Sequence, residues 1–198
     1  MILHPENGEE LEKKLVLLGS STVGKTSILN RFMRDTYSEQ TVATVGTSIK
    51  TKTVTVNNYK VKLQIWDTGG HERFRSLTPM YFHDADACII VYDITSKQSF
   101  DEVKYWLKDL DEKGPQEVLI ALAGNKCDLE SLRNVLTVDG NGFAEKNNIP
   151  IFMETSAQSG ENIAELFTVI AAGFVTETQT QFRHKLVLKQ EEKEKSCC

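Results

Sequence analysis

The segment that most constrains this chain spans residues 19–26, reads GSSTVGKT and directly follows the apolar run Leu15–Leu18. The spacing G-x-x-x-x-G-K-[ST] lets a backbone curl its N–H groups around phosphate oxygens, because glycine tolerates the tightest turns. A helix that begins near Lys25 points its positive end at the same anion. We expect Lys25 to reach the β- and γ-phosphates of a nucleotide and the Thr26 hydroxyl to bind Mg²⁺. The segment therefore predicts a phosphate-binding loop between a strand and a helix.

Length, charge and hydropathy limit the classes of protein that fit. A chain of 198 residues supports one domain with a full core, followed here by a tail. The net charge of −5 argues against a general nucleic-acid binder, so we expect no nucleic-acid partner. No apolar run approaches the ~20 residues of a membrane span, and the first residues lack a signal-peptide pattern. These features predict a cytoplasmic protein.

The cysteines agree with that compartment. Cys88 and Cys127 are isolated in the sequence, whereas Cys197 and Cys198 are adjacent. Their spacing matches neither a disulfide framework nor a zinc site.

Hydrophobic patterns along the chain alternate between strands and helices. The predicted strands cover residues 14–19, 48–56, 59–66, 87–92, 118–123 and 151–153, and the predicted helices cover 25–34, 98–112, 138–146 and 161–176. Asn57-Asn58 suits a two-residue hairpin between the second and third strands. The alternation predicts an α/β fold, and the phosphate-binding loop after its first strand places it in the P-loop NTPase class. We expect a mostly parallel six-stranded sheet with one antiparallel edge strand and helices on both faces.

Composition divides the chain into three parts. Residues 1–10 predict a flexible leader, residues 11–178 the folded domain, and residues 179–198 a flexible tail. Basic and acidic residues are too balanced in the tail for a strong polybasic membrane patch. Membrane attachment would therefore need lipid.

A motif after the fifth predicted strand selects the base. Asn125-Lys126-Cys127-Asp128 places a carboxylate where it can accept hydrogen bonds from guanine N1–H and the 2-amino group together. Adenine offers no such pair of donors, so a buried Asp128 would be left unpaired against it at a discriminating cost. Asn125 would brace the loop, and Lys126 would lay its alkyl stem over the base. After the sixth predicted strand, Ala157 can present its N–H to guanine O6.

With these motifs the chain resembles a small GTPase of the Ras superfamily from about residue 12 to 177. Residues 45–49, VGTSI, and residues 73–77, RFRSL, resemble the Rab branch, as does the final Cys197-Cys198 pair. The resemblance implies that GTP or GDP is the bound nucleotide and Mg²⁺ the cofactor. It also implies that GTP is hydrolysed to GDP.

The resemblance assigns roles to further residues. Thr44 matches a threonine that binds Mg²⁺ when the γ-phosphate is present, Asp67 matches an acid that holds Mg²⁺ through water, and Gly70 matches a glycine whose N–H meets the γ-phosphate. Tyr37 matches an aromatic residue that covers the guanine edge. The expected metal residues are Thr26, Thr44 and Asp67, and the expected catalytic residues are His71, Lys25 and Gly70. The candidate nucleotide-binding residues are Ser21, Thr22, Val23, Gly24, Lys25, Thr26, Ser27, Tyr37, Thr44, Gly70, Asn125, Lys126, Asp128, Ser156, Ala157 and Gln158.

The chain departs from the Rab pattern at three places. Where Rab proteins usually read Ala-Gly-Gln, residues 69–71 read Gly-Gly-His, so His71 replaces the glutamine that orients water. Gln158 replaces a usual lysine, and Thr22 occupies a loop position that is often glycine. The first departure predicts slow intrinsic hydrolysis.

Cys197 and Cys198 resemble the double cysteine on which Rab proteins receive two geranylgeranyl groups. Two lipid chains anchor a protein stably where one anchors it marginally. The resemblance implies a protein that cycles between the cytoplasm and the cytoplasmic face of intracellular membranes. It also implies exchange factors, GTPase-activating proteins, an extraction chaperone and effectors as partners.

The sequence thus favours a Rab-type GTP-binding switch that regulates vesicle trafficking, in which GTP orders residues 37–49 and 67–82. An alternative is a scaffold that holds GTP without hydrolysing it, which His71 favours. A P-loop kinase for a small nucleotide is a third reading, disfavoured because no Arg-rich lid segment is present and Asp128 would have no clear role in it.

Overall fold

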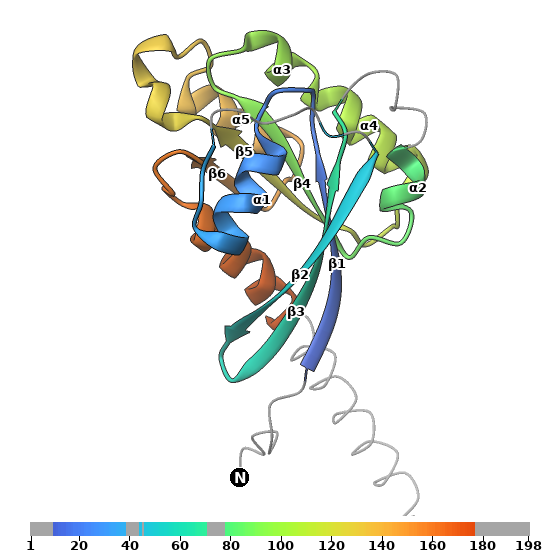
Figure 1. The fold of residues 1–198 in the computed structure, drawn as a ribbon. Helices are drawn as coiled ribbons and strands as arrows, with labels where there is room; N and C mark the ends of the chain where they lie inside the picture. The colour runs from blue at the N-terminus through green and yellow to red at the C-terminus, as the bar shows by residue number, and fades with distance from the viewer. Residues whose placement is uncertain (1–9, 39–43, 45, 71–77, 177–198) are drawn as a thin grey trace, which may run out of the picture.

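The structure is a computed structural model that describes residues 10–38, 44, 46–70 and 78–176 (Figure 1). Its strands are β1 Glu10–Leu18, β2 Thr47–Val56, β3 Tyr59–Thr68, β4 Ala87–Asp93, β5 Leu119–Asn125 and β6 Ile151–Thr155. Its helices are α1 Lys25–Arg34, α2 Thr78–Phe82, α3 Lys97–Asp101, α4 Val103–Lys113, the 3-10 helix η2 Cys127–Leu132 and α5 Thr137–Lys146. A further helix covers residues 163–176.

The six strands of the described chain form one sheet in the order β2-β3-β1-β4-β5-β6. β2 and β3 pair antiparallel, and Asn57 and Asn58 join them with φ angles of 47° and 70°. Such angles are what a two-residue hairpin turn requires, and asparagine tolerates them. β1 pairs in parallel with both β3 and β4, and β5 and β6 continue the parallel order. The predicted sheet with one antiparallel edge strand is therefore confirmed.

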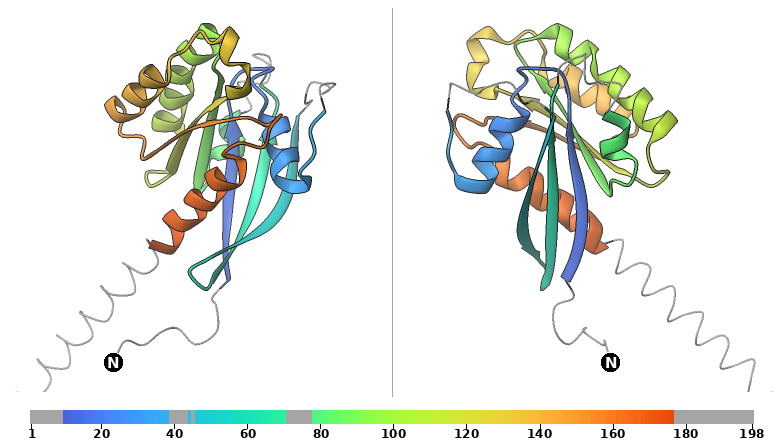
Figure 2. Two further views of the ribbon diagram at one scale, coloured as in Figure 1. Left: turned by 90° about the vertical axis from the view of Figure 1, so that its left-hand side faces the viewer. Right: turned by 45° about the vertical axis from the view of Figure 1, so that its right-hand side comes forward.

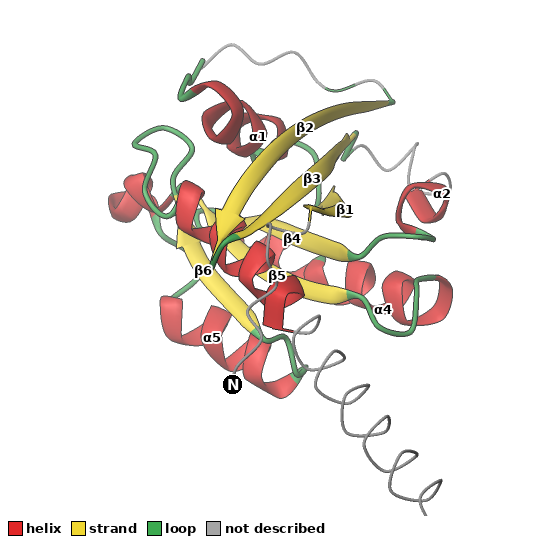
Figure 3. Ribbon diagram, turned by 90° about the horizontal axis from the view of Figure 1, so that it is seen from below, coloured by secondary structure: helices red, strands yellow, loops and turns green. Residues whose placement is uncertain are grey.

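Helices cover both faces of the sheet, with α1 on one side and α4 and α5 on the other (Figure 3). Leu15 and Leu17 pack on the face that carries α1 and the helix of residues 163–176. Val16 and Leu18 pack on the opposite face, with α2, α4 and α5. Coverage of both faces explains why β1 and β4 contain nearly continuous apolar runs. None of the described helices is long and apolar enough to cross a membrane.

The first strand begins earlier than the sequence predicts. β1 starts at Glu10, which was assigned to the leader, and not at Lys14. Residues 10–13 pair with Lys60 through Leu63 of β3, and this long-range pairing is invisible in a local pattern. In Figure 2 this part of β1 extends with the β2–β3 hairpin beyond the helices.

Several helices also differ from the prediction. The helix predicted over residues 98–112 is divided into α3 and α4 at Glu102, whose N–H donates to both the Gln98 and Phe100 carbonyls. The short helices α2 and η2 were not predicted, because neither has enough residues to show a period.

Most strands also run one or two residues beyond their apolar cores. Asp67, Asp93, Asn125 and Thr155 all remain paired within the sheet. Asp93 pairs with Asn125, which pairs with Thr155 on its other side. Polar side chains are therefore held by the ladder at the carboxyl edge of the sheet, where open α/β sheets bind ligands.

Candidate nucleotide site

A cavity of about 400 Å³ lies at this carboxyl edge. It is lined by the loop after β1, the first turn of α1, the loops after β3, β5 and β6, and three residues of the segment between α1 and β2. The lining residues are Ser21, Thr22, Gly24, Lys25, Thr26, Ser27, Tyr37, Ser38, Thr44, Thr68, Gly70, Asn125, Lys126, Asp128, Leu129, Ala157 and Gln158. Every predicted nucleotide-binding residue is among them except Val23 and Ser156, which are buried. His71 lies outside the described residues.

The phosphate loop depends on backbone angles that favour glycine. Gly19 has a φ of 136° and Gly24 a φ of 99°. A Cβ on Gly19 would collide with the Val91 carbonyl of β4, and one on Gly24 would collide with the Asn125 amide. Glycine is therefore required at both positions for conformation and for space. Thr22 adopts a φ of 66°, a left-handed angle that costs a β-branched residue about 1–2 kcal/mol.

Lys25 is buried at the floor of the loop. Its Nζ donates hydrogen bonds to the Gly19 carbonyl at 2.7 Å and the Ser20 carbonyl at 2.8 Å. Burial lowers the pKa of Lys25 to about 8, while the charge of Asp67 acts in the opposite direction. A desolvated ammonium group of this kind interacts strongly with an anion that reaches it.

Gly70 lies against the phosphate loop. A Cβ at this position would collide with Lys25 Nζ and with the Ser20 carbonyl. The close approach of the two loops therefore depends on glycine. It brings the segment after β3 into the same cavity wall as the phosphate loop.

Three oxygen-bearing side chains meet beside the loop. Thr26 Oγ1 donates to Asp67 Oδ2 at 2.7 Å and lies 2.8 Å from Thr44 Oγ1. Asp67 is fully buried, and its Oδ1 has no hydrogen-bond partner in the described structure. Burial raises the pKa of Asp67, whereas the Thr26 hydrogen bond and the Lys25 charge lower it. Hydroxyl and carboxylate oxygens, one of them unpaired, fit a hard divalent cation such as Mg²⁺.

Asn125 connects two loops of the site. Its Nδ2 donates to the Val23 carbonyl at 2.8 Å, and its Oδ1 accepts from Thr155 Oγ1 and from the Ala157 N–H, each at 3.3 Å. Val23 thus contributes through its carbonyl and does not line the cavity. The side chain of Asn125 holds the phosphate loop and the loop after β6 together. The Ala157 N–H is directed at Asn125, and its contact with guanine stays a prediction.

Asp128 is exposed at the cavity rim. The prediction that it is buried is therefore wrong. The reason is local: the chain turns at the end of β5 through Lys126, with a φ of 68°, into η2 at the protein surface. Ser156 Oγ donates to Asp128 Oδ1 at 2.5 Å and accepts from the Ser159 N–H at 3.0 Å. Ser156 therefore orients the carboxylate from behind.

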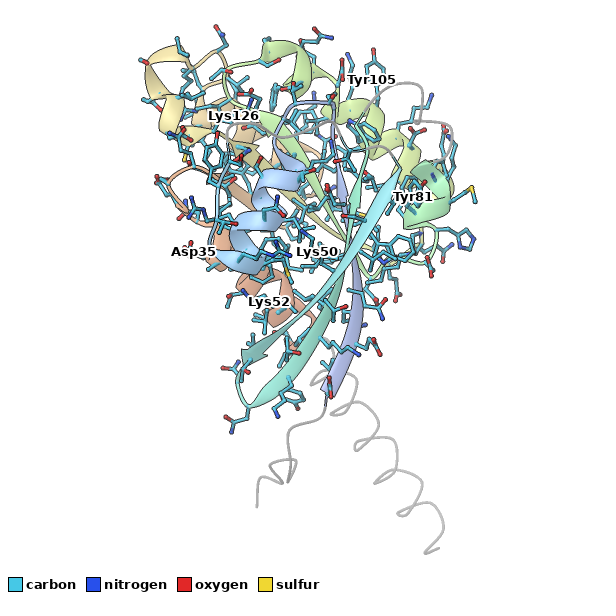
Figure 4. The ribbon with its side chains drawn as sticks, in the orientation of Figure 1. Asp35, Lys50, Lys52, Tyr81, Tyr105 and Lys126 are labelled. Atoms are coloured by element: carbon cyan, nitrogen blue, oxygen red, sulfur yellow. The ribbon has the colours of Figure 1, made fainter. Side chains whose placement is uncertain are left out.

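Lys126 is held by a residue that sequence reasoning missed. Its Nζ forms an ion pair of 2.6 Å with Oδ2 of Asp93, which is buried at the end of β4. Figure 4 shows Lys126 at the upper end of the molecule, where the parallel strands finish. A polar residue that ends an apolar strand was a usable signal for Asp93, since Asn125 occupies the paired position in β5.

Arg31 of α1 is the other missed residue. Its Nε donates to the Ala157 carbonyl at 2.8 Å and its Nη2 to the Gln158 carbonyl at 2.5 Å. These bonds fix the loop after β6 on the cavity wall. No sequence signal pointed to Arg31, because its partners lie 126 and 127 residues away along the chain.

The fold and the phosphate loop together define a P-loop NTPase. The family model described as Ras family matches residues 14–175. The chain is 45% identical over 169 residues to the GTP-binding protein ypt5 of Schizosaccharomyces pombe, an alignment that covers 84% of this chain and 80% of that protein. It is 44% identical over 165 residues to the Ras-related protein Rab-5A of Dictyostelium discoideum, with 83% and 82% covered. It is 46% identical over 160 residues to human Ras-related protein Rab-22A, with 81% and 82% covered.

The chain therefore belongs to the Ras family. Together with the Rab names of these relatives, the match makes it a Rab-type small GTPase.

Proposed function

We propose that this GTPase is a Mg²⁺-dependent switch that binds GTP, hydrolyses it to GDP and regulates vesicle trafficking. The observation that carries the proposal is convergence on one cavity. The phosphate loop, the Thr26–Thr44–Asp67 group and the base-recognition loop held by Asn125 all border or support it. These are the parts that bind phosphate, metal and base in the proposed reaction.

The residues of the cavity have distinct proposed roles. Backbone N–H groups of the phosphate loop would bind the β-phosphate, and Lys25 would neutralise charge on the β- and γ-oxygens. Asp128 would accept from the guanine donors, and Tyr37, which is 39% exposed at the rim, would cover the edge of the base. Thr26, Thr44 and Asp67 would hold Mg²⁺, which neutralises phosphate charge when bound.

Competition against a fluorescent GDP analogue tests nucleotide choice. The full-length protein with Mg²⁺ is expected to release the analogue to unlabelled GTP and GDP and not to ATP at the same concentration. Equal competition by ATP, or no binding of the analogue, would overturn the proposal.

The proposed switch needs a surface that effectors can contact. Ile49 of β2 and Trp66 of β3 are directly opposite in the antiparallel pair, so they share a face. The Trp66 and Tyr81 ring centroids are 6.4 Å apart, and Met80 beside Tyr81 is 72% exposed. Figure 4 shows Tyr81 on α2. Ile49, Met80 and Tyr81 of this apolar surface belong to the segments 37–49 and 67–82, whose ordering by GTP would control partner binding.

We also propose that Cys197 and Cys198, both outside the described residues, carry geranylgeranyl groups that attach the protein to intracellular membranes. The Rab resemblance supports this anchor, together with exchange factors, GTPase-activating proteins and an extraction chaperone as regulators. Replacing both cysteines with serine is expected to move the protein from the membrane fraction to the cytosol without changing GDP affinity. Persistent membrane association would point to another anchor.

A GTP-holding scaffold remains the second candidate, because His71 stands where the water-orienting glutamine is usual. The two functions differ in turnover. Single-turnover measurement of preloaded GTP distinguishes them: formation of GDP in the presence of a GTPase-activating protein supports the switch, and its absence supports the scaffold.

A further inference from the structure

Glu102, between α3 and α4, contacts the phosphate loop. Ser20 Oγ donates a hydrogen bond to Glu102 Oε2, although the two residues are 82 positions apart. Gln98 Nε2 donates to Glu102 Oε1 at 3.0 Å. Both oxygens of this carboxylate therefore have donors, and one donor belongs to the loop that would hold the nucleotide phosphates.

Ser20 is also joined to two other parts of the site. Its carbonyl accepts a hydrogen bond from Lys25 Nζ at 2.8 Å. Gly70 packs so closely on the same carbonyl that a Cβ could not be accommodated. A displacement of Ser20 would therefore move a partner of the phosphate-binding lysine and a contact of the segment after β3.

Hydrogen bonds and core packing fix the backbone around Glu102. Its N–H donates to the carbonyls of Gln98 and Phe100, and the flanking Phe100 and Val103 are buried in the core. Ser96 caps α3 by accepting from the Ser99 N–H at 3.2 Å. A side chain held on fixed backbone can transmit position to the group that it contacts.

A second cavity explains why this one hydrogen bond has a large effect on the position of the phosphate loop. It has a volume of about 370 Å³ and lies between the phosphate loop and the helices α3 and α4. Residues 20–23 form one wall, and Glu102, Tyr105 and Trp106 belong to the opposite wall. Figure 4 shows Tyr105 at the same upper end as Lys126. Packing across a cavity is weaker than across a filled interface, so a polar bridge between its walls carries more of the restraint.

We propose that Glu102 is a positioning residue for the bound nucleotide, which it retains by holding the phosphate loop through Ser20. The inference rests on the proposed nucleotide site and adds a determinant of nucleotide release to it. A hydrogen bond to a carboxylate is roughly twice as strong as a neutral one. Its loss would let the loop leave the conformation that encloses the phosphates, and GDP and GTP would both dissociate faster.

The test is the dissociation rate of fluorescent GDP and GTP analogues from the full-length protein with Mg²⁺. Glu102→Ala is expected to raise both rates about three- to tenfold, which corresponds to the loss of part of a charge-assisted hydrogen bond. Glu102→Gln is expected to give a rate between those of the parent and Glu102→Ala, because the amide oxygen still accepts from Ser20 but without the charge. Asp101→Ala is the matched control, since it removes a neighbouring charge that pairs with Lys97 at 3.6 Å.

A double-mutant cycle separates positioning from general destabilisation. If Glu102 acts through Ser20, then Ser20→Ala combined with Glu102→Ala releases nucleotide no faster than the faster single variant. Multiplicative effects, or an unchanged rate in Glu102→Ala, would overturn the inference and leave the proposed function standing. Failure of the parent protein to bind the analogue would overturn both. Should Glu102→Ala not fold, Ser20→Ala supplies the measurement, and an unchanged rate in that variant again overturns the inference.

Discussion

Thr26 Oγ1 and Asp67 Oδ2 are 2.7 Å apart, and this hydrogen bond joins the first turn of α1 to the end of β3. The helix follows the phosphate loop and the strand leads into the segment with Gly70, so the bond links these two parts of the site. The second Asp67 oxygen is buried without a partner in the described structure. An unpaired buried carboxylate oxygen is costly unless a cation or donor satisfies it, which makes this point the expected position for Mg²⁺.

Thr26→Asn is expected to weaken binding of Mg²⁺-GTP by about tenfold more than binding of GDP. The hydroxyl lost in this variant contacts both Asp67 and Thr44 and would hold Mg²⁺, whose charge neutralisation matters most when the γ-phosphate is present. Calorimetric titration of both nucleotides measures the difference. Equal weakening of GTP and GDP would argue against the assigned role of Thr26.

Asp128→Asn is expected to shift the base preference from guanine to xanthine. The carboxylate would accept from the guanine 2-amino group, whereas an amide can donate to the 2-oxo group of xanthine. The loss of GTP affinity should be at least about a hundredfold, because a mismatched polar group is left unpaired on binding. Competition between GTP and XTP decides the matter, and a variant that still prefers GTP would show that Asp128 does not contact the base.

The sequence predicts much of this fold because local periodicity identifies β1 to β6 and α1 as separate elements. It also predicts most of the cavity wall, since the motifs around Lys25 and Asp128 follow strands whose carboxyl ends meet at one edge. What it misses depends on distance along the chain. Arg31 and Glu102 lie within helical patterns and acquire their roles from partners 126 and 82 residues away, respectively. The exposure of Asp128 was missed as well, because it depends on how η2 leaves the sheet.

Cys127 is expected to react slowly with thiol reagents despite its place in the base-recognition motif. The pKa of the Cys127 thiol is raised to about 12, mainly by burial and in part by the neighbouring Glu161 carboxylate. Glu161 Oε2 accepts a hydrogen bond from Cys127 Sγ at 3.6 Å. The thiolate is the reactive form, so alkylation by iodoacetamide at pH 7.5 should be about tenfold or more slower than at an ordinary cysteine. The rate should still be rising at pH 10, where an ordinary thiol has reached its plateau.

Glu161→Gln provides the matched variant for Cys127. Removing the carboxylate lowers the pKa of the thiol, so its alkylation should accelerate at pH 7.5. Mass spectrometry of the peptide containing Cys127 separates it from the other cysteines. Fast alkylation in the parent protein would contradict the proposed environment.

His71→Gln is expected to hydrolyse GTP about tenfold or more faster than the parent, a barrier lower by at least ~1.4 kcal/mol. A glutamine amide accepts from the attacking water and donates from one flexible arm. A neutral histidine has its donor and acceptor on opposite sides of a rigid ring, and it loses the acceptor on protonation below about pH 6.5. Single-turnover hydrolysis at pH 7.5 gives the comparison; a His71→Gln variant no faster than the parent would show that water positioning by residue 71 does not limit hydrolysis.

Thr22→Gly is expected to raise the free energy of unfolding by about 0.5–1 kcal/mol, because the strain of a left-handed threonine exceeds the entropy that glycine adds to the unfolded chain. Thr22 has a φ of 66° and an exposed side chain, so the substitution removes strain without opening a core cavity. Asn57→Gly is the control, since Asn57 has a φ of 47° and asparagine tolerates such angles. Urea unfolding of the two variants should show a gain for Thr22→Gly and little change for Asn57→Gly. An equal gain in both, or a loss in Thr22→Gly, would mean that the loop accommodates threonine without strain.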